Sequence, residues 1–91
     1  LRTEREERLW QALRTWRKQR ATQDNVPAYV VFPDRTLQNL VEAAPQSLAD
    51  LVGIYGMGSS KIDKYGAEVV ALCQDIAAEH SEGVLNSASG L

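Results

Sequence analysis

The longest helical pattern in the sequence lies near its amino-terminal end, over residues 3–22. This stretch contains no Gly or Pro and is rich in residues with high helix propensity. Leu9, Leu13 and Trp16 recur at spacings of four and three residues, which places them on one helix face, and Trp10 flanks that face. We therefore predict one long amphipathic helix.

The next segment, residues 23–33, interrupts this pattern. Pro27 and Pro33 bracket the apolar run Ala28–Phe32. The run is typical of a strand, but the sequence offers no second strand to pair with its backbone groups. We interpret it as a buried apolar loop that is either extended or folded into one tight turn.

Two shorter helices are predicted next. Asp34 has the side chain of an N-cap, Leu37, Leu40, Val41 and Ala44 follow at helical spacing, and Pro45 ends the helix. The run Ser47–Asp50 resembles a capping box for a short helix that carries Leu48, Leu51 and Val52. Gly53 is a natural left-handed stop, and Ile54 would fold back onto the helix.

The last predicted helix follows the glycine-rich turn of residues 53–58. It begins near Ser59 and runs to about residue 80, with Gly66 as an interruption or bend. Its apolar face consists of Ile62, Tyr65, Val69, Leu72, Cys73 and Ile76. Residues 81–91 lack apolar periodicity, so we expect a flexible tail after a domain over residues 1–80. The predicted fold class is an all-α, compact single-domain bundle.

The composition agrees with one small folded domain. Leu, Ile, Val and Phe make up 22 of the 91 residues, above the roughly 20% below which disorder is expected. The sequence has no apolar run long enough for a membrane span and no export signal. A single Cys73 and a single His80 exclude an internal disulfide and argue against a zinc site. We expect a cytoplasmic protein, nucleoid-associated if bacterial, and we interpret the chain as a piece of a longer one.

The charge is distributed unevenly. Residues 1–23 carry a balance of +4 and residues 24–91 a balance of −6, which gives the net charge of −2. The segment from Leu9 to Gln23 contains no acid but four bases, which are Arg14, Arg17, Lys18 and Arg20. These bases form either a solvated helix face or half of an electrostatic contact surface.

Two motifs carry a resemblance to a known family. The first is V-P-x-Y-V-V-F-x-D over residues 26–34, after the basic helix, and the second is G-x-G-x-x-K over residues 56–61, which leads to Tyr65-Gly66. Together with residues 9–17, Leu37 and residues 48–52, they resemble the HRDC (helicase and RNase D C-terminal) domain, and RecQ-type DNA helicases are the most similar group. The similarity covers about residues 5–80.

The resemblance implies a bundle of about five helices with a short 3₁₀ turn. It also implies a non-catalytic accessory domain, without a cofactor or metal, that binds DNA weakly and modulates the core of an ATP-dependent 3′–5′ DNA helicase. The sequence agrees in having no phosphate-binding loop of the type G-x-x-x-x-G-K-[ST].

Tyr29 matches a tyrosine of the family that contacts single-stranded DNA in some members. An exposed tyrosine offers a face on which a base can stack. The alternative is that Tyr29 is a partly buried core aromatic in an apolar loop.

Lys61 has the placement of a phosphate contact behind the turn, whose Gly56, Gly58 and Ser59 would face the phosphate. Alternatively, the glycines only permit a sharp reversal and Lys61 is solvated. Arg14, Arg17, Lys18 and Arg20 would extend the nucleic-acid-binding surface, together with Arg35 and Lys64.

Acidic residues on the final helix argue against strong DNA binding; they are Asp63, Glu68 and Asp75. A second hypothesis is therefore a protein-interaction or regulatory domain whose acidic part docks on the helicase core or on another protein. One positive face that contains both Tyr29 and Lys61 would favour the DNA hypothesis.

Overall fold

A computed structural model describes the backbone of residues 2–89 and the side chains of residues 2–79. Its longest amino-terminal element is helix α1 (Glu4–Asp24), as predicted. Thr3 caps this helix: its hydroxyl accepts a hydrogen bond from the Glu6 amide, and the Glu6 carboxylate accepts one from the Thr3 amide. The helix ends at Asn25, which has the left-handed conformation.

The segment after α1 folds into helix α2 (Ala28–Val31), a single turn, followed by helix α3 (Asp34–Ala43). Asp34 was predicted as the N-cap of α3, but Pro33 occupies that position and Asp34 is the first helical residue. The prediction of a buried loop is only partly right. Val31 and Phe32 are buried, whereas Tyr29 and Val30 are exposed, because one helical turn points successive side chains in different directions.

Between α3 and the last helices lies a segment with one 3₁₀ turn, η1 (Ala49–Leu51). The Ser47 hydroxyl accepts a hydrogen bond from the Asp50 amide, as a capping box requires. The Asp50 carboxylate departs from that motif and accepts a hydrogen bond from the Gln46 amide. Gly53 and Gly56 both have positive φ, so the chain reverses twice at residues that tolerate this conformation.

The final helical region is continuous but irregular. It comprises α4 (Ser59–Lys61), the π-helical turn η2 (Ile62–Gly66) and α5 (Ala67–Ser89). The interruption predicted at Gly66 is this wider turn. Helix α5 extends beyond residue 80, where we expected it to end. Residues 90–91 of the predicted tail lie outside the described residues, and the flexibility of the tail stays a prediction.

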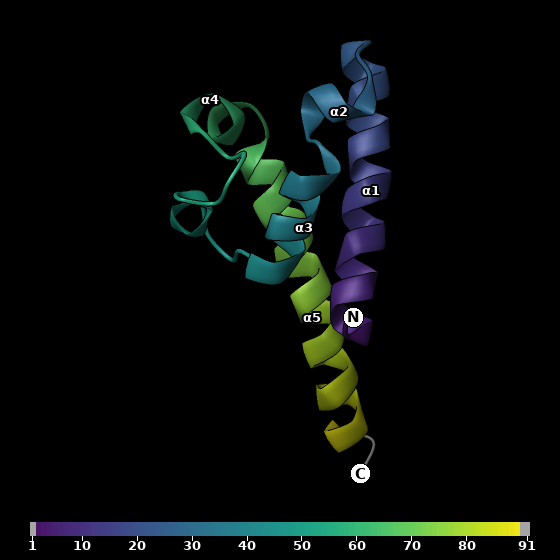
Figure 1. Ribbon diagram of the computed structural model, residues 1–91. Helices are drawn as coiled ribbons and strands as arrows, with labels where there is room; N and C mark the ends of the chain where they lie inside the picture. Colours follow the sequence, from purple (N-terminus) through teal and green to yellow (C-terminus); the bar gives the residue numbers. More distant parts are fainter. Residues whose placement is uncertain (1, 90–91) are drawn as a thin grey trace.

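The core lies where α1, α3 and α5 meet the segment between α3 and α4. Helix α1 contacts α2, α3 and α5, and Figure 1 shows α2 beside the end of α1 that lies far from the amino terminus. The fully buried side chains include Leu13, Phe32, Leu37, Leu40, Leu51 and Val69. The described residues form five α-helical segments and a 3₁₀ turn without any strand, which confirms the predicted all-α fold.

An aromatic cluster links three parts of this fold. The ring centroids of Trp16, Phe32 and Tyr65 lie between 5.5 and 5.8 Å from one another. Such pairs stabilise a fold beyond the burial of their surface. The cluster therefore links α1, the end of α2 and the π-helical turn, and the ammonium of Lys61 lies near two of its rings.

Candidate nucleic-acid interface

Helix α2 presents Tyr29 to solvent. The Tyr29 side chain is 69% exposed although it sits in the most apolar part of the sequence. Its neighbours Val31 and Phe32 are fully buried and anchor the turn to the core. Of the two readings of Tyr29, the structure therefore excludes the buried core aromatic and leaves an accessible ring.

Lys61 reaches the same turn from α4. Its Nζ donates hydrogen bonds to the carbonyl oxygens of Val30 and Val31, at 2.6 and 2.8 Å. The ammonium also lies 5.7 and 5.5 Å from the ring centroids of Phe32 and Tyr65. Partial burial, with a smaller contribution from the charge of Lys64, lowers the pKa of Lys61. The ammonium is thus held against α2.

Arg17 reaches α2 from α1. Its Nη1 donates a hydrogen bond to the carbonyl oxygen of Phe32 at 2.8 Å and forms an ion pair with Asp34 at 2.8 Å. The Arg17 side chain is only 12% exposed. Two bases far apart in the sequence, Arg17 and Lys61, are therefore brought to one short stretch of backbone, and their role in DNA binding stays a prediction.

Arg20 and Lys64 lie in a separate network around Asp24. Arg20 forms ion pairs with Asp24 and Glu68 at 3.5 and 2.9 Å, and Lys64 lies 3.6 Å from the Asp24 carboxylate. The hydroxyl of Tyr65 donates a hydrogen bond to Asp24 at 2.9 Å. This bond, followed by the charges of Arg20 and Lys64, holds the pKa of Asp24 below its ordinary value. Acidic partners thus compensate both bases.

Arg14 and Lys18 differ from Arg17 and Arg20, the neighbouring bases of α1. Both are exposed, and neither forms an ion pair with any described residue. With Arg17 and Ala28 they line one shallow pocket at the junction of α1 and α2. Two uncompensated cations therefore lie beside the turn that carries Tyr29.

Arg35 and the glycine-rich turn form another pair of contacts. The Arg35 guanidinium lies 4.3 Å from the centroid of the exposed Tyr55 ring. Gly56 packs on Thr36, and Gly58 is the N-cap of α4, followed by Ser59. The predicted phosphate-facing role of Gly56, Gly58 and Ser59 stays a prediction.

The sequence over residues 6–73 matches the family model described as the HRDC domain. The chain belongs to the HRDC domain family. This confirms the resemblance seen in the two motifs, and the matched range includes every base considered above together with Tyr29 and the glycine-rich turn.

Relatives of this HRDC domain are DNA helicases. The chain is 43% identical over 67 residues to the ATP-dependent DNA helicase UvrD2 of Mycobacterium tuberculosis, which covers 74% of the chain and 10% of the relative. It is 40% identical over 67 residues to the ATP-dependent DNA helicase RecQ of Haemophilus influenzae, covering 74% of the chain and 11% of the relative. RecQ of Bacillus subtilis is 41% identical over 58 residues, covering 64% of the chain and 10% of the relative.

The HRDC domain thus spans about a tenth of the length of these helicases. The RecQ relatives were expected from the motifs, whereas the UvrD2 relatives were not. No helix among the described residues is long and apolar enough to cross a membrane. In that part of the HRDC domain no group of three or more His, Cys, Asp or Glu side chains is arranged so that it could hold a metal ion.

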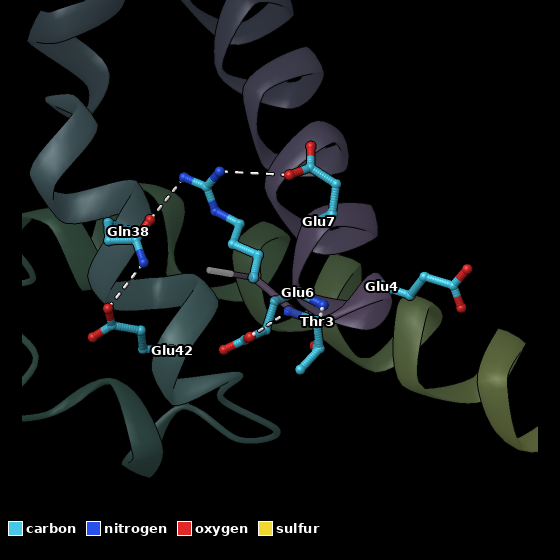
Figure 2. A pocket seen from close by; sticks show the side chains of 7 residues that line it. Thr3, Glu4, Glu6, Glu7, Gln38 and Glu42 are labelled. Carbon is cyan, nitrogen blue, oxygen red and sulfur yellow. Dashed lines mark hydrogen bonds and ion pairs between the residues drawn. The ribbon is translucent and has the colours of Figure 1, made fainter.

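An acidic pocket of the HRDC domain was missed by sequence reasoning. Figure 2 shows Glu4, Glu6 and Glu7 of α1 with Gln38 and Glu42 of α3 around it. Arg2 lies in this pocket, where it donates to Gln38 at 2.8 Å and pairs with Glu7 at 3.5 Å. The three glutamates lie in the first turn of α1, where they suit the helix dipole, and only the packing of α3 brings Glu42 beside them.

Proposed function

We propose that this HRDC domain is a non-catalytic accessory domain of an ATP-dependent 3′–5′ DNA helicase of the RecQ type. It binds single-stranded or branched DNA weakly and modulates which substrates the helicase core engages. The observation that carries this proposal is the exposed Tyr29 ring, on a turn flanked by the uncompensated bases Arg14 and Lys18. The domain needs no cofactor of its own, and the proposal places the parent protein in the cytoplasm.

The arrangement suits a single strand better than a base-paired duplex. The Tyr29 ring gives one unstacked base a face to lie on, and such stacking is worth about 1–3 kcal/mol per base. Arg14 and Lys18 supply positive charge to the adjacent phosphates. Bases in a duplex are already stacked on each other, so the exposed Tyr29 ring can stack more readily on an unpaired base of a single strand.

The charge distribution explains why the binding is weak. Acidic or carbonyl partners already bind most of the other bases, namely Arg17, Arg20, Lys61 and Lys64. Arg14 and Lys18 are therefore left to neutralise about two phosphates. For a single strand this gives a slope of log K against log salt of about −1.4. Micromolar or weaker affinity that fades as salt rises is expected.

The test is a titration of the chain into a labelled single-stranded oligonucleotide at several salt concentrations. The Arg14→Met/Lys18→Met variant should bind at least ten times more weakly than the wild type. Its control is Arg5→Met/Arg8→Met, which removes the same formal charge near the other end of α1, where Arg8 is paired with Glu79. Absence of wild-type binding at low salt would defeat the proposal, and equal losses in both variants would reduce it to an effect of net charge.

A protein-interaction or regulatory domain is the second candidate. Exposed apolar side chains favour it, because Leu48, Val52 and Tyr55 are all exposed on one short segment between α3 and α4. The acidic pocket of Figure 2 would suit a basic partner surface. The test of this second candidate measures the preference of the full-length helicase for forked over linear DNA, with and without the double substitution Leu48→Ser/Val52→Ser. A changed preference together with unchanged DNA affinity of the isolated chain would favour this candidate.

A further inference from the structure

Helix α2 cannot maintain its own conformation. It has only four residues, and nucleation of so short a helix is unfavourable unless tertiary contacts compensate for it. The last carbonyl groups of any helix also lack partners within that helix. The turn that carries Tyr29 therefore depends on groups outside it.

Those groups are the two bases described above. The carbonyl oxygens of Val30 and Val31 both accept hydrogen bonds from Lys61, and the next carbonyl, that of Phe32, accepts one from Arg17. Three successive carbonyl groups at the end of α2 are thus bound by two cations, one from α4 and one from α1. Charged donors form stronger hydrogen bonds than neutral ones.

We propose that Lys61 and Arg17 are positioning residues, which hold α2 and therefore Tyr29 in place, rather than contacts to phosphate. The inference rests on the proposed function, since it assigns Lys61 and Arg17 a role within that DNA-binding surface. It differs from the expectation drawn from the sequence, in which the ammonium of Lys61 points at a phosphate.

The geometry favours this role for both residues. An ammonium group has three donors, and two of those of Lys61 are taken by carbonyl oxygens at 2.6 and 2.8 Å. The rings of Phe32 and Tyr65 also lie against the ammonium. Arg17 is largely buried and neutralised by Asp34. In contrast, Lys18 is exposed and has no ion-pair partner among the described residues, which makes it the matched control for a true phosphate contact.

The first test is the salt dependence of single-strand binding. Removal of one phosphate contact reduces the magnitude of the slope of log K against log salt by about 0.7. Lys18→Met should show that reduction. Lys61→Met and Arg17→Met should lower the affinity at least fivefold and leave the slope unchanged. A reduced slope in Lys61→Met would overturn the inference.

The second test uses Tyr29→Ala as a background. If Lys61 acts through the position of Tyr29, Lys61→Met should change the affinity of Tyr29→Ala by less than twofold. Lys18→Met should weaken both backgrounds equally. Equal effects of Lys61→Met in both backgrounds would contradict a positioning role. The Arg17 side chain holds the end of α2 from α1. Arg17→Met therefore serves the same test if Lys61→Met fails to fold.

The third test needs no DNA. The amide of Phe32 donates to the Ala28 carbonyl within the turn, and its hydrogen exchange reports whether α2 is formed. Lys61→Met should accelerate this exchange at least tenfold, whereas Lys18→Met should not. If the wild type fails to bind DNA but the exchange accelerates, the proposed function fails while the anchoring of α2 by Lys61 stands. If the exchange is unchanged, the inference fails whatever the DNA titration shows.

Discussion

The side chain of Thr36 fills the space directly beneath Gly56. Thr36 is completely buried, and a β-carbon placed on Gly56 would collide with its hydroxyl oxygen and press on its methyl group. Gly56 also has a φ of 87°, in the left-handed region. The glycine-rich turn is therefore docked on α3 through a contact that admits no side chain.

Gly56→Ala should destabilise the fold more than Gly53→Ala does. Both positions have positive φ, which costs an alanine about 1–2 kcal/mol. At Gly53 nothing lies within 4 Å of the added carbon, whereas at Gly56 the overlap with Thr36 adds about 1–3 kcal/mol. Urea unfolding of the two variants measures the difference. Equal losses would show that the turn is not packed on α3 as described.

Arg17→Met should lower the unfolding free energy by about 1–3 kcal/mol, because it leaves the Phe32 carbonyl without its charged donor. Asp34→Asn removes the ion pair with Arg17 and the favourable negative charge at the amino-terminal end of α3, and leaves the hydrogen bond from Arg17 to the Phe32 carbonyl in place. Since the Asp34 side chain is 77% exposed, this pair should contribute less than about 1 kcal/mol. Thermal unfolding of both variants distinguishes the hydrogen bond from the ion pair. A larger effect of Asp34→Asn would reverse this ranking.

Asp24→Asn should destabilise the protein near neutral pH and progressively less in acid. The pKa of Asp24 lies below its ordinary value of 3.8 because Tyr65, Arg20 and Lys64 favour the carboxylate. A lowered pKa means that the contribution is complete above the unfolded-state pKa and disappears as the pH falls through the folded-state pKa. Melting temperatures of wild type and variant between pH 7 and pH 2 should therefore converge below pH 3.8. A constant difference in melting temperature over this range would show that the loss of stability does not come from the ionised carboxylate of Asp24.

The thiol of Cys73 should react with a thiol reagent only after unfolding. Burial among apolar side chains raises the pKa of Cys73 to about 11, so little thiolate exists at pH 8 in the folded protein. Modification should be slow in buffer and rapid in denaturant. Fast labelling of the folded chain would mean that α5 opens away from the core.

Tyr29→Ala should weaken single-strand binding by about fivefold to a hundredfold, which corresponds to about 1–3 kcal/mol for one stacked base. Its melting temperature should stay close to that of the wild type, since the ring is mostly exposed. Tyr55→Ala is the matched control, because it removes another exposed tyrosine from a different segment. Equal losses of affinity in both variants would argue against a specific role for Tyr29.

The sequence predicts the helices well because their signals are local. Leu9 and Leu13 mark the buried face of α1 through spacing alone, and both are buried. The predicted N-cap of α3, Asp34, is one residue too late, because Pro33, with its fixed φ, is equally suited to begin a helix. Such errors concern boundaries and leave the fold class intact.

The site is less predictable because its bases act over long separations in the chain. Lys61 binds carbonyl groups about thirty positions earlier, and no spacing rule connects an ammonium with a distant backbone oxygen. The same limit applies to Arg20, which pairs with Glu68 forty-eight positions later. Sequence reasoning can select the charged residues, but packing decides which of them keep an uncompensated charge.

The π-helical turn Ile62–Gly66 sets the rotational phase of the final helical region. A regular α-helix advances by about 100° per residue, and a π-helical turn accommodates one extra residue. The side chains before the turn are therefore rotated by about 100° relative to those after it, compared with a regular helix of the same length. Lys61 can thereby face α2 while Val69 and Cys73 face the core. Regular α-helical geometry with the same number of residues would swing Lys61 by about 100°, away from the carbonyl groups that it binds, whereas deletion of one residue from this turn would give a regular helix in which Lys61 keeps its direction.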